Sequence, residues 1–276
     1  MEWPGGRLDF TSGPLVMGIL NVTPDSFSDG GMYFDTDRAV EHGLAMARAG
    51  AAILDIGAES TRPGSKSVSS EEQIKRAVPV IRRLFSRVNI PISIDTKDPQ
   101  VAQAAADAGA AILNDITALT DDRMKAVAVR NKMAAVLMHM RGDPETMQAQ
   151  PQYDDVVVEV SRYLLEKAEQ AQAAGLPAEH IILDPGIGFG KTTEHNLSLL
   201  KHLNRLVESG YPVLVGTSRK RFIGQITGRD KADERTYGTA ATVALAVAAG
   251  AKILRVHDVS EMIEVIKIAW AVKTAP

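Results

Sequence analysis

The sequence of 276 residues contains no cysteine, and this absence excludes several kinds of chemistry. Without thiols the chain has no disulfide framework, no thiolate metal site and no thiol nucleophile. An excess of charge of one sign is also lacking, because 31 Lys and Arg stand against 34 Asp and Glu. The formal net charge of -3 gives no electrostatic argument for nucleic acid as a partner. We therefore do not expect a nucleic acid partner.

Long hydrophobic runs are lacking as well. The longest weakly polar run, around residues 240–251, is rich in alanine, interrupted by glycine and too short to span a bilayer. The N-terminal residues 1–13 contain no basic segment followed by an apolar one, so no signal peptide is visible. We expect a cytoplasmic protein without a membrane partner. Its hydrophobic content of 45% suits one domain over residues 1–276, since barrels of about 250 residues commonly form a single domain.

Short apolar runs alternate with helical stretches along the whole chain. Runs of this kind, separated by ten or more helical residues, predict βα units on a parallel sheet. The predicted strands are Val16–Leu20, Ala52–Ile56, Ile92–Ile94, Ala111–Leu113, Ala135–Met138, Ile181–Leu183, Val213–Val215 and Ile253–Val256. The predicted helices are 36–49, 70–86, 99–108, 121–130, 153–174, 193–209, 235–249 and 260–273. Eight strands and eight helices predict an α/β fold, a (β/α)8 TIM barrel, with an open doubly wound sheet as the alternative.

Glycines and a serine support these boundaries. Gly50, Gly109 and Gly250 each follow a predicted helix and precede an apolar strand, where a residue with positive φ is expected. Ser69 and Glu72 have the spacing of a capping box at the start of the helix 70–86. The repeated pattern of helix, glycine and strand favours one architecture throughout.

Polar residues stand at the ends of the predicted strands. A single one is usually a cap or a turn former, but so many at the converging strand ends of a barrel indicate a ligand site. The residues are Asn21, Asp55, Asp95, Asn114, His139, Asp184, Ser218, Arg255 and His257.

The stretch LDPGIGFGKT, residues 183–192, looks at first like a nucleotide-binding loop. A Walker A loop needs a glycine five residues before its last glycine, but that position is Pro185, which has no N–H to donate to a phosphate. The stretch instead offers a strand-end carboxylate, Asp184, and an aromatic ring, Phe189, which suit a flat heterocycle with an N–H edge. The alternative is that Asp184 caps the turn and Phe189 covers the barrel rim. We expect Lys191 and Thr192 to begin the next helix.

The chain resembles the dihydropteroate synthase family along nearly its whole length. The matching segments are MGILNVTPDSFSDGG (17–31), DIGAESTRPG (55–64), SIDT (93–96), ILNDI (112–116), VLMHMRG (136–142), LDPGIGFGKT (183–192), VGTSRKRFIG (215–224) and RVHDV (255–259). The family has a (β/α)8 barrel and joins 4-aminobenzoate to 6-hydroxymethyl-7,8-dihydropterin pyrophosphate with Mg²⁺. The resemblance implies this transferase reaction, a step of folate biosynthesis, and competition by sulfonamides, which mimic aminobenzoate.

The resemblance also implies roles for individual residues. The pterin would contact Asp95, Asn114, Met138, Asp184, Phe189 and Lys220. The pyrophosphate would contact Arg255, His257 and Asn21, and Asn21 would also bind Mg²⁺. Ser260 begins the last predicted helix, whose N-terminus favours anions. The aminobenzoate would contact Phe27, Thr61, Arg62, Pro63 and Ser218, and Asp29 would help to stabilise the charged intermediate. When pyrophosphate leaves, a pterin cation forms, and this step needs no serine or cysteine nucleophile. It also needs no proton transfer by a histidine, so His139 receives no role. Arg62, Lys220, Arg255 and His257 join Asp29 as the expected catalytic residues.

Some observations leave alternatives open. Arg255 could pair with Asp258 instead of binding pyrophosphate, and His257 could be a strand-end histidine with structural partners only. The chain departs from the family pattern at Ala58, at Ala118 and over residues 130–133, where glycines are usual. A barrel that transfers a methyl group from a reduced pterin to a corrinoid, and a pterin-binding module without catalysis, are the rival functions.

An apolar helix bears on assembly. The predicted helix 235–249 is apolar nearly all round, which exceeds what an outer barrel helix needs. Together with the habit of the family, this favours a homodimer.

Overall fold

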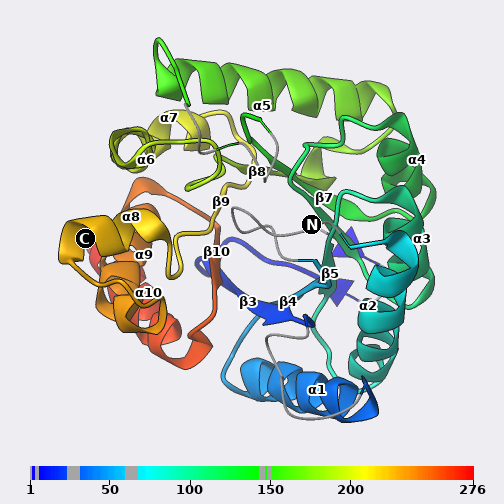
Figure 1. The fold of residues 1–276 in the computed structure, drawn as a ribbon. Helices are drawn as coiled ribbons and strands as arrows, with labels where there is room; N and C mark the ends of the chain where they lie inside the picture. The colour runs from blue at the N-terminus through cyan, green and yellow to red at the C-terminus, as the bar shows by residue number, and fades with distance from the viewer. Residues whose placement is uncertain (1, 4–5, 24–31, 60–67, 143–146, 148–150) are drawn as a thin grey trace.

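The computed structural model describes residues 2–3, 6–23, 32–59, 68–142, 147 and 151–276. Eight parallel strands surround a common centre, with helices outside them (Figure 1). In the order in which they pair, the strands are β8 (Ile181–Asp184), β7 (Ala134–Met138), β6 (Ile112–Asp115), β5 (Ile92–Asp95), β4 (Ile53–Gly57), β3 (Leu15–Asn21), β10 (Ile253–Val256) and β9 (Leu214–Val215). The parallel order follows from the helix between each strand and the next, since parallel strands need a crossover connection.

The circle of strands closes between β8 and β9. Leu183 and Val213 form a parallel bridge, and the N–H of Leu183 donates to the carbonyl oxygen of Pro212 at 2.9 Å. This pairing is short: β3 and β4, for comparison, pair over five residues in register. The bridge completes a (β/α)8 barrel, so the predicted barrel is confirmed and the open doubly wound sheet is wrong.

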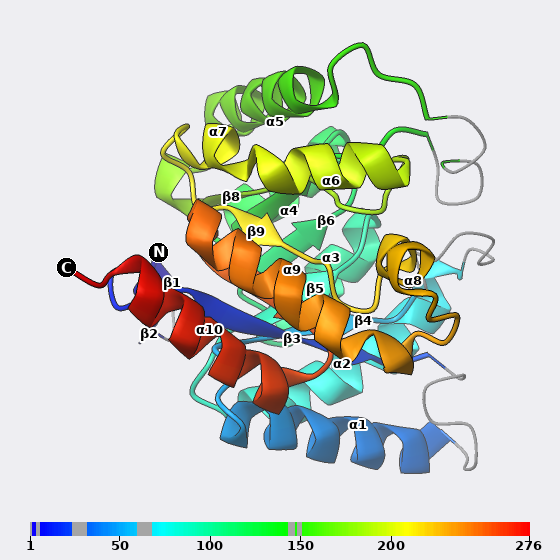
Figure 2. The ribbon, with the colours of Figure 1, turned by 90° about the vertical axis from the view of Figure 1, so that its left-hand side faces the viewer.

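The helices form an outer layer around the strands, and Figure 2 shows α8, α9 and α10 together on one side of the molecule. They are α1 (Met32–Arg48), α2 (Ser70–Phe85), α3 (Pro99–Asp107), α4 (Asp122–Arg130), α5 (Val156–Ala173), α6 (Thr193–Lys201), α7 (Leu203–Val207), α8 (Arg221–Thr227), α9 (Thr236–Ala249) and α10 (Val259–Lys273). Two short 3-10 helices, η2 (Ala178–His180) and η3 (Asp233–Arg235), precede β8 and α9. Among the described residues, no helix combines the length and the apolar character needed to cross a membrane.

The strands bury side chains on both faces, as strands of parallel sheets do. One apolar layer lies between the strands and the helices, and another fills the barrel interior near the beginnings of the strands. The interior layer consists of Met17, Ile53, Ile112, Ala134, Val136, Ile182, Leu214 and Ile253, closed by Leu8. Leu8 follows a small antiparallel hairpin, β1 (Glu2–Trp3) and β2 (Gly6–Arg7), and the apolar filling leaves the opposite end of the barrel for polar residues.

Most predicted boundaries are close to those observed, with three corrections. The predicted helix 193–209 is two helices, α6 and α7, which meet at His202. The helix α8 and the N-terminal hairpin were not predicted, because seven residues and two residue pairs are too short to show a periodicity. Gly50, Gly109 and Gly250 have φ of 103°, 110° and 108°, so the predicted helix-ending role of these glycines is confirmed.

The predicted capping box at α2 is half formed. The Oγ atom of Ser69 accepts from the backbone N–H of Glu72 at 3.3 Å, as an N-cap residue should. The carboxylate of Glu72 instead pairs with Arg76 one turn later, at 2.8 Å.

Candidate functional site

The alternation of the strands carries polar groups into the barrel interior. Side chains two residues apart in a strand point to the same face. Two positions beyond the interior apolar residues Ile53, Ile112, Ile182 and Ile253 come Asp55, Asn114, Asp184 and Arg255. The same relation leads from Met17 through Ile19 to Asn21 and from Ser93 to Asp95. The carboxyl ends of the strands therefore direct a ring of polar side chains to one place, as the sequence predicted.

Arg255 stands at the centre of this ring. Its Nε atom donates to Oδ2 of Asp55 at 2.6 Å, and its Nη2 atom donates to Oδ2 of Asp95 at 2.6 Å. The Nδ2 atom of Asn114 donates to the same Oδ2 of Asp55 at 3.1 Å. One guanidinium thus joins two carboxylates from β4 and β5, and Asp258 is not its partner.

Three carboxylates gather here. Asp55, Asp95 and Asp184 share the site with the cations Arg255 and Lys220. Burial raises the pKa of Asp95 to about 7 against the lowering effect of Arg255, and Asp55 raises it further. Among the described residues, Oδ1 of Asp55 is a buried oxygen without a hydrogen-bond partner. A site with surplus acceptors favours a ligand with N–H donors.

Asp184 ends β8 and begins the glycine-rich loop 185–192. Its side chain is 6% exposed, and its Oδ1 atom accepts from the backbone N–H of Gly186 at 2.7 Å. Burial raises the pKa of the Asp184 carboxyl, while Lys220 and the Gly186 N–H lower it. Asp184 therefore does cap its turn, but this contact uses one oxygen and leaves the second for other donors.

Lys220 approaches the same loop from the other side. Its Nζ atom lies 3.9 Å from the centre of the Phe189 ring, in a cation–π arrangement. Burial lowers the pKa of Lys220 to about 8, and Arg255 lowers it as well. The aliphatic stem passes close to Gly188, where a Cβ atom would lie 3.1 Å from Cδ of Lys220. A glycine with φ of 85° makes room for this approach.

Apolar side chains form a wall beside the polar ring. Ile116, Met138, Met147 and Phe189 are each buried and touch one another, with Met140 packed against them. A pocket of about 330 Å³ opens next to this wall and shares Ile116 and Met140 with it. Methionines and an aromatic ring beside buried acceptors can hold the face of a flat heterocycle. The predicted pair Met138 and Phe189 is therefore brought together.

Two contacts join the loops after β9 and β10. Oγ of Ser218 accepts from the backbone N–H of His257 at 3.2 Å and lies 3.0 Å from Nδ1 of the same histidine. This geometry lets the Ser218 hydroxyl donate to Nδ1. Beside it, Arg219 pairs with Asp258 through both nitrogens of its fork. These contacts bring Ser218 and His257, expected at different subsites, side by side.

Asn21 and Ser260 lie at the rim. Asn21 ends β3, and a Cβ atom built on Gly57 would lie 3.5 Å from its Oδ1 and 3.9 Å from Oδ2 of Asp95. Among the described residues, no group of three His, Asp or Glu side chains could by itself hold a metal ion. Ser260, in the first turn of α10, is exposed and donates its hydroxyl to Glu261 at 2.7 Å.

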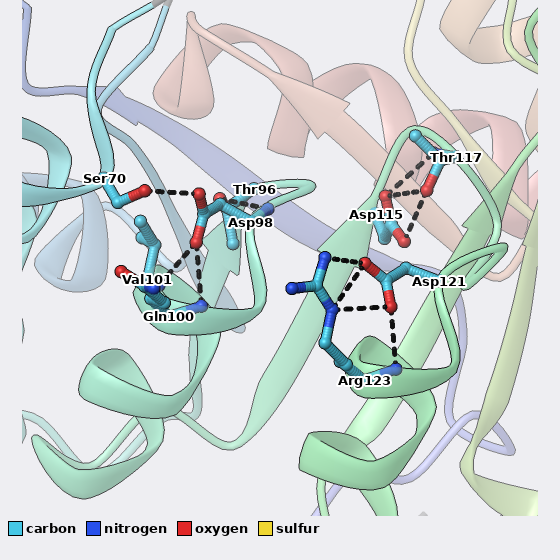
Figure 3. A network of polar contacts seen from close by, with 9 residues as sticks. All are labelled: Ser70, Thr96, Asp98, Gln100, Val101, Asp115, Thr117, Asp121 and Arg123. Atoms are coloured by element: carbon cyan, nitrogen blue, oxygen red, sulfur yellow. Dashed lines mark hydrogen bonds and ion pairs between the residues drawn. The ribbon is translucent and has the colours of Figure 1, made fainter.

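Figure 3 shows how the chain after β5 and β6 is fixed near the rim. Asp98 caps α3 through the N–H groups of Gln100 and Val101 and accepts from Oγ of Ser70 at the start of α2. Asp115 is fully buried and accepts from Thr117 and from the N–H of Leu119. These carboxylates are used by local backbone donors, so they hold the loops and are not members of the polar ring.

Lys191 corrects one sequence expectation. The residue is 3% exposed, and its Nζ atom donates to the carbonyl oxygens of Gly186 and Phe189, both at 3.0 Å. A lysine directed at carbonyl oxygens cannot bind a phosphate, so the rejection of a nucleotide-binding loop agrees with the structure. The expectation that Lys191 begins the next helix is wrong. Thr192 does cap α6, in a capping box with His195.

Part of the expected site lies outside the described residues. This applies to Phe27 and Asp29 in the segment 24–31 and to Thr61, Arg62 and Pro63 in the segment 60–67. The expected roles of these five residues stay predictions.

Sequence reasoning placed Asp55 among the strand-end polar residues but gave it no role, and it did not assign Ile116 or Met147 to the site. Asp55 carried the signal, since it stands two positions after an interior residue, but the resemblance gave it no role. Ile116 and Met147 are apolar residues in loops, and nothing in their neighbours distinguishes them from core residues.

The comparisons with known proteins agree with this geometry. Residues 17–257 match the family model described as pterin binding enzyme. The dihydropteroate synthase of Escherichia coli strain K12 is 45% identical over 271 residues, which cover 98% of this chain and 95% of that protein. Matches of this extent show that the chain belongs to the class of pterin-binding enzymes.

Solved structures refine the class. The dihydropteroate synthase of Xanthomonas albilineans in complex with 7,8-dihydropteroate is 44% identical, with a TM-score of 0.88 over 98% of this chain and 97% of that one. The Yersinia pestis dihydropteroate synthase in complex with a sulfonamide drug is 42% identical, with a TM-score of 0.94 over 100% and 99% of the two chains. The chain belongs to the dihydropteroate synthase family of pterin-binding enzymes.

Proposed function

We propose that this protein condenses 6-hydroxymethyl-7,8-dihydropterin pyrophosphate with 4-aminobenzoate to give 7,8-dihydropteroate and pyrophosphate. The observation that carries the proposal is the buried acceptor ring around Arg255, walled on one side by Met138 and Phe189. A pterin is flat and has an edge of N–H donors, so its chemistry complements this site. Membership of the dihydropteroate synthase family supports the same substrates.

The pterin would bind between Asp184 and Lys220. The carboxylate can accept two adjacent N–H groups of the aminopyrimidinone edge, as it would from a guanidinium. Asp95 and Asn114 would satisfy the remaining polar edge, and Lys220 would donate to a ring acceptor. The ring face would pack on Met138 and Phe189, which lie together in the apolar wall, and Lys220, which lies over one face of Phe189, would border the ring.

The pyrophosphate would lie toward β10, where positive charge is available. Arg255 uses Nε and Nη2 for carboxylates, and its Nη1 atom carries two further N–H donors. His257 lies next to it at the end of the strand, with Nδ1 facing Ser218. Phosphate sites on barrels frequently lie at the ends of the last two strands, which supports this placement.

The reaction would proceed by departure of the leaving group. The carbon–oxygen bond to pyrophosphate breaks, and the electron pair leaves with pyrophosphate, whose charge Arg255 and His257 would stabilise. The resulting cation delocalises into the dihydropterin, close to Asp95 and Asp184. The amine nitrogen of aminobenzoate then attacks the cation, forms the new carbon–nitrogen bond and loses a proton to solvent. The protein supplies positioning and electrostatic stabilisation.

The residues at the rim fit Mg²⁺ as a partner of the pyrophosphate. Mg²⁺ keeps several waters and usually takes only one or two protein oxygens in addition to phosphate oxygens. Asn21 would supply such an oxygen, since its Oδ1 atom and Oδ2 of Asp95 approach the same point above Gly57. When bound, the ion would neutralise charge on the leaving group.

The aminobenzoate would reach the pterin from the side of Ser218. This residue is 5% exposed and joined to His257, so it borders the pyrophosphate site. Phe27, Thr61, Arg62 and Pro63 would complete the pocket, and Asp29 would stabilise the cation. Sulfonamides, which resemble aminobenzoate, should therefore compete with it. The Yersinia pestis relative in complex with a sulfonamide supports this expectation.

A single assay tests the proposal. Purified protein with Mg²⁺, the pterin pyrophosphate and 4-aminobenzoate should release pyrophosphate and form dihydropteroate in equal amounts. Omission of 4-aminobenzoate is the control, because simple hydrolysis of the pterin pyrophosphate would continue without it. No product from a folded protein would end the proposal. A methyl transfer to a corrinoid would instead require no aminobenzoate.

We also propose that the protein forms a homodimer through the side of α8, α9 and α10. Large apolar side chains are exposed there: Ile226 (58%), Tyr237 (91%), Leu245 (61%), Ile268 (69%) and Val272 (73%). Figure 2 shows the three helices on one side. Light scattering on the purified protein should give twice the mass of the chain, and L245E should reduce it to the monomer. A cytoplasmic location stays a prediction.

A further inference from the structure

Lys191 is a buried cation for which the reaction has no use. Its Nζ atom has four acceptors: the carbonyl oxygens of Gly186 and Phe189 at 3.0 Å, that of His139 at 3.2 Å, and Nδ1 of His139 at 3.0 Å. None of the ion pairs in the described part of the chain includes Lys191. Burial of a charge that has no carboxylate in contact is costly. The hydrogen bonds to backbone carbonyl oxygens offset part of this cost and at the same time fix the backbone around Lys191.

The four acceptors come from two different loops. His139 follows β7, whereas Gly186 and Phe189 belong to the loop after β8. The two loops touch backbone to backbone, because a Cβ atom at Gly186 would lie 1.9 Å from the carbonyl oxygen of His139. A Cβ atom at Gly190 would lie 2.4 Å from that of Arg141. The ammonium of Lys191 thus ties together two backbones that only glycine allows to come so close.

The loop after β8 needs such a tie. Gly186, Gly188 and Gly190 have φ of 65°, 85° and 59°. Three glycines within five residues give the free loop many conformations, and ordering them carries a large entropic cost. Hydrogen bonds from a charged donor are stronger than neutral ones and can offset this cost.

The backbone that Lys191 holds is in contact with Asp184 and includes Phe189, two residues that would bind the pterin. The backbone N–H of Gly186 donates to Asp184 at 2.7 Å, and the carbonyl oxygen of the same residue accepts from Lys191 at 3.0 Å. The carbonyl oxygen of Phe189 is held in the same way, and the Phe189 ring faces Lys220. Lys191 therefore holds the backbone at Gly186, which binds the Asp184 side chain, and at Phe189, whose ring would cover the pterin.

We propose that Lys191 is a positioning residue for pterin recognition, which locks the loop after β8 against the end of β7 and thereby orients Asp184 and Phe189. The inference rests on the proposed function only where it names the pterin. His139 belongs to the lock as an acceptor: its Nδ1 atom faces an ammonium, so the ring proton resides on Nε2. Burial lowers the pKa of Lys191 to about 7 and that of His139 to about 3, so at pH 6.5 most of the lysine is charged and the histidine is neutral.

Three measurements at pH 6.5 test the proposal with Lys191→Met, which keeps the apolar stem and removes every donor. Hydrogen exchange in residues 184–190 should become at least tenfold faster, while exchange in β3 to β6 stays unchanged. Affinity for 6-hydroxymethyl-7,8-dihydropterin pyrophosphate, measured by calorimetry, should fall at least tenfold. Affinity for inorganic pyrophosphate should change less than twofold, because Arg255 lies in β10 and His257 directly follows it, away from the loop after β8. The control is Lys201→Met, on the exposed side of α6, which should alter none of these values.

The outcomes separate positioning from general stability. Lys191→Arg keeps several donors and should restore the pterin affinity to within threefold of the parent protein. Unchanged exchange and unchanged pterin affinity in Lys191→Met would overturn the proposal. Faster exchange throughout the barrel, with pterin and pyrophosphate affinities falling together, would overturn it as well. If Lys191→Met does not fold, Lys191→Arg is the deciding variant. Hydrogen exchange like that of the parent protein together with a loss of pterin affinity in Lys191→Arg would contradict the proposal.

The exchange measurement also separates this proposal from the proposed function, because it needs no ligand. A parent protein that binds no pterin would end the proposed function. Faster exchange in residues 184–190 of Lys191→Met would still show that Lys191 holds the loop.

Discussion

Nη2 of Arg255 lies 2.6 Å from Oδ2 of Asp95, although the two residues come from the last and the third strand of the barrel. The closure of the barrel brings them together, since β5 and β10 are not neighbours in the sheet. The guanidinium also binds Asp55, so one cation compensates two buried carboxylates. The arrangement predicts strong effects on both stability and reaction when Arg255 is replaced.

Arg255→Met should lower the free energy of unfolding by about 3–5 kcal/mol, because it leaves buried carboxylates without their cation. It should also abolish formation of dihydropteroate, since the leaving pyrophosphate loses its guanidinium. Urea denaturation and the synthase assay measure the two effects. Arg48→Met, at an exposed position of α1, is the control and should change neither value. A stable but inactive Arg255→Met protein would mean that the two carboxylates tolerate the loss of their cation at little cost.

Asp184→Asn should weaken pterin binding at least tenfold. The amide oxygen can still accept from the N–H of Gly186, but the charge and the second acceptor oxygen are lost. A charge-assisted hydrogen bond contributes about 1.5–3 kcal/mol, which corresponds to roughly ten- to a hundredfold in affinity. Calorimetric titration with the pterin pyrophosphate measures the change. Asp122→Asn, at a carboxylate that is 94% exposed, should leave the affinity as it was; equal affinities for all three proteins would place the pterin elsewhere.

The reaction should slow as the pH rises through about 8. Burial lowers the pKa of Lys220 to about 8, so the side chain is charged below this pH and neutral above it. The neutral amine loses one donor and its attraction for the pterin and the pyrophosphate. The dependence of kcat/KM on pH should therefore show an alkaline limb near 8. In Lys220→Arg, whose guanidinium keeps its charge, the limb near 8 should disappear, and only the decline that follows deprotonation of Lys191 near 7 should remain; a limb near 8 that persists unchanged belongs to a different group.

Lys132→Gly should stabilise the protein. Lys132 is exposed, follows the C-cap residue Asn131 of α4 and has φ of 52°, a conformation that costs a residue with a Cβ atom about 1–2 kcal/mol. Glycine adopts it freely but loses more entropy on folding, so a net gain of about 0.5–1 kcal/mol remains. Thermal unfolding measures the gain. Lys125→Gly, within the same helix, should have the opposite sign and cost about 1 kcal/mol; a loss of stability for both would refute the strain at Lys132.

The positions of Lys132 and Ala118 also explain two departures from the family pattern. The sequence has lysine and alanine where glycines are usual, and both residues have positive φ, 52° and 55°. The chain keeps the backbone conformation that glycine would favour and bears the strain. At Ala118 the carboxylate of Asp115 holds the turn through the N–H groups of Thr117 and Leu119. The departures therefore change the local energy but not the path of the chain.

How much could be predicted depended on the range of the interactions. Asp184 and Asp95 could be placed because the period of a strand fixes which side chains enter a barrel. The partner of Arg255 could not, since Asp55 is 200 residues away and the nearby Asp258 was an equal candidate. Lys191 was misinterpreted because its partners are carbonyl oxygens, which every residue has and which leave no signature in a sequence. The short helix α8 was missed because seven residues show no clear periodicity.

The narrow joint between β8 and β9 has a consequence for how the barrel would respond to its substrate. The joint contains the single bridge of Leu183 with Val213, so it is where the ring of strands should part most readily. Asp184 ends the strand on one side of the joint, and Lys220 follows the strand on the other. A pterin bound by both residues would connect the two sides of the joint. Its binding would therefore also stabilise the pairing of β8 with β9, and local opening at this joint would be rarer in the ligand-bound protein than in the free protein.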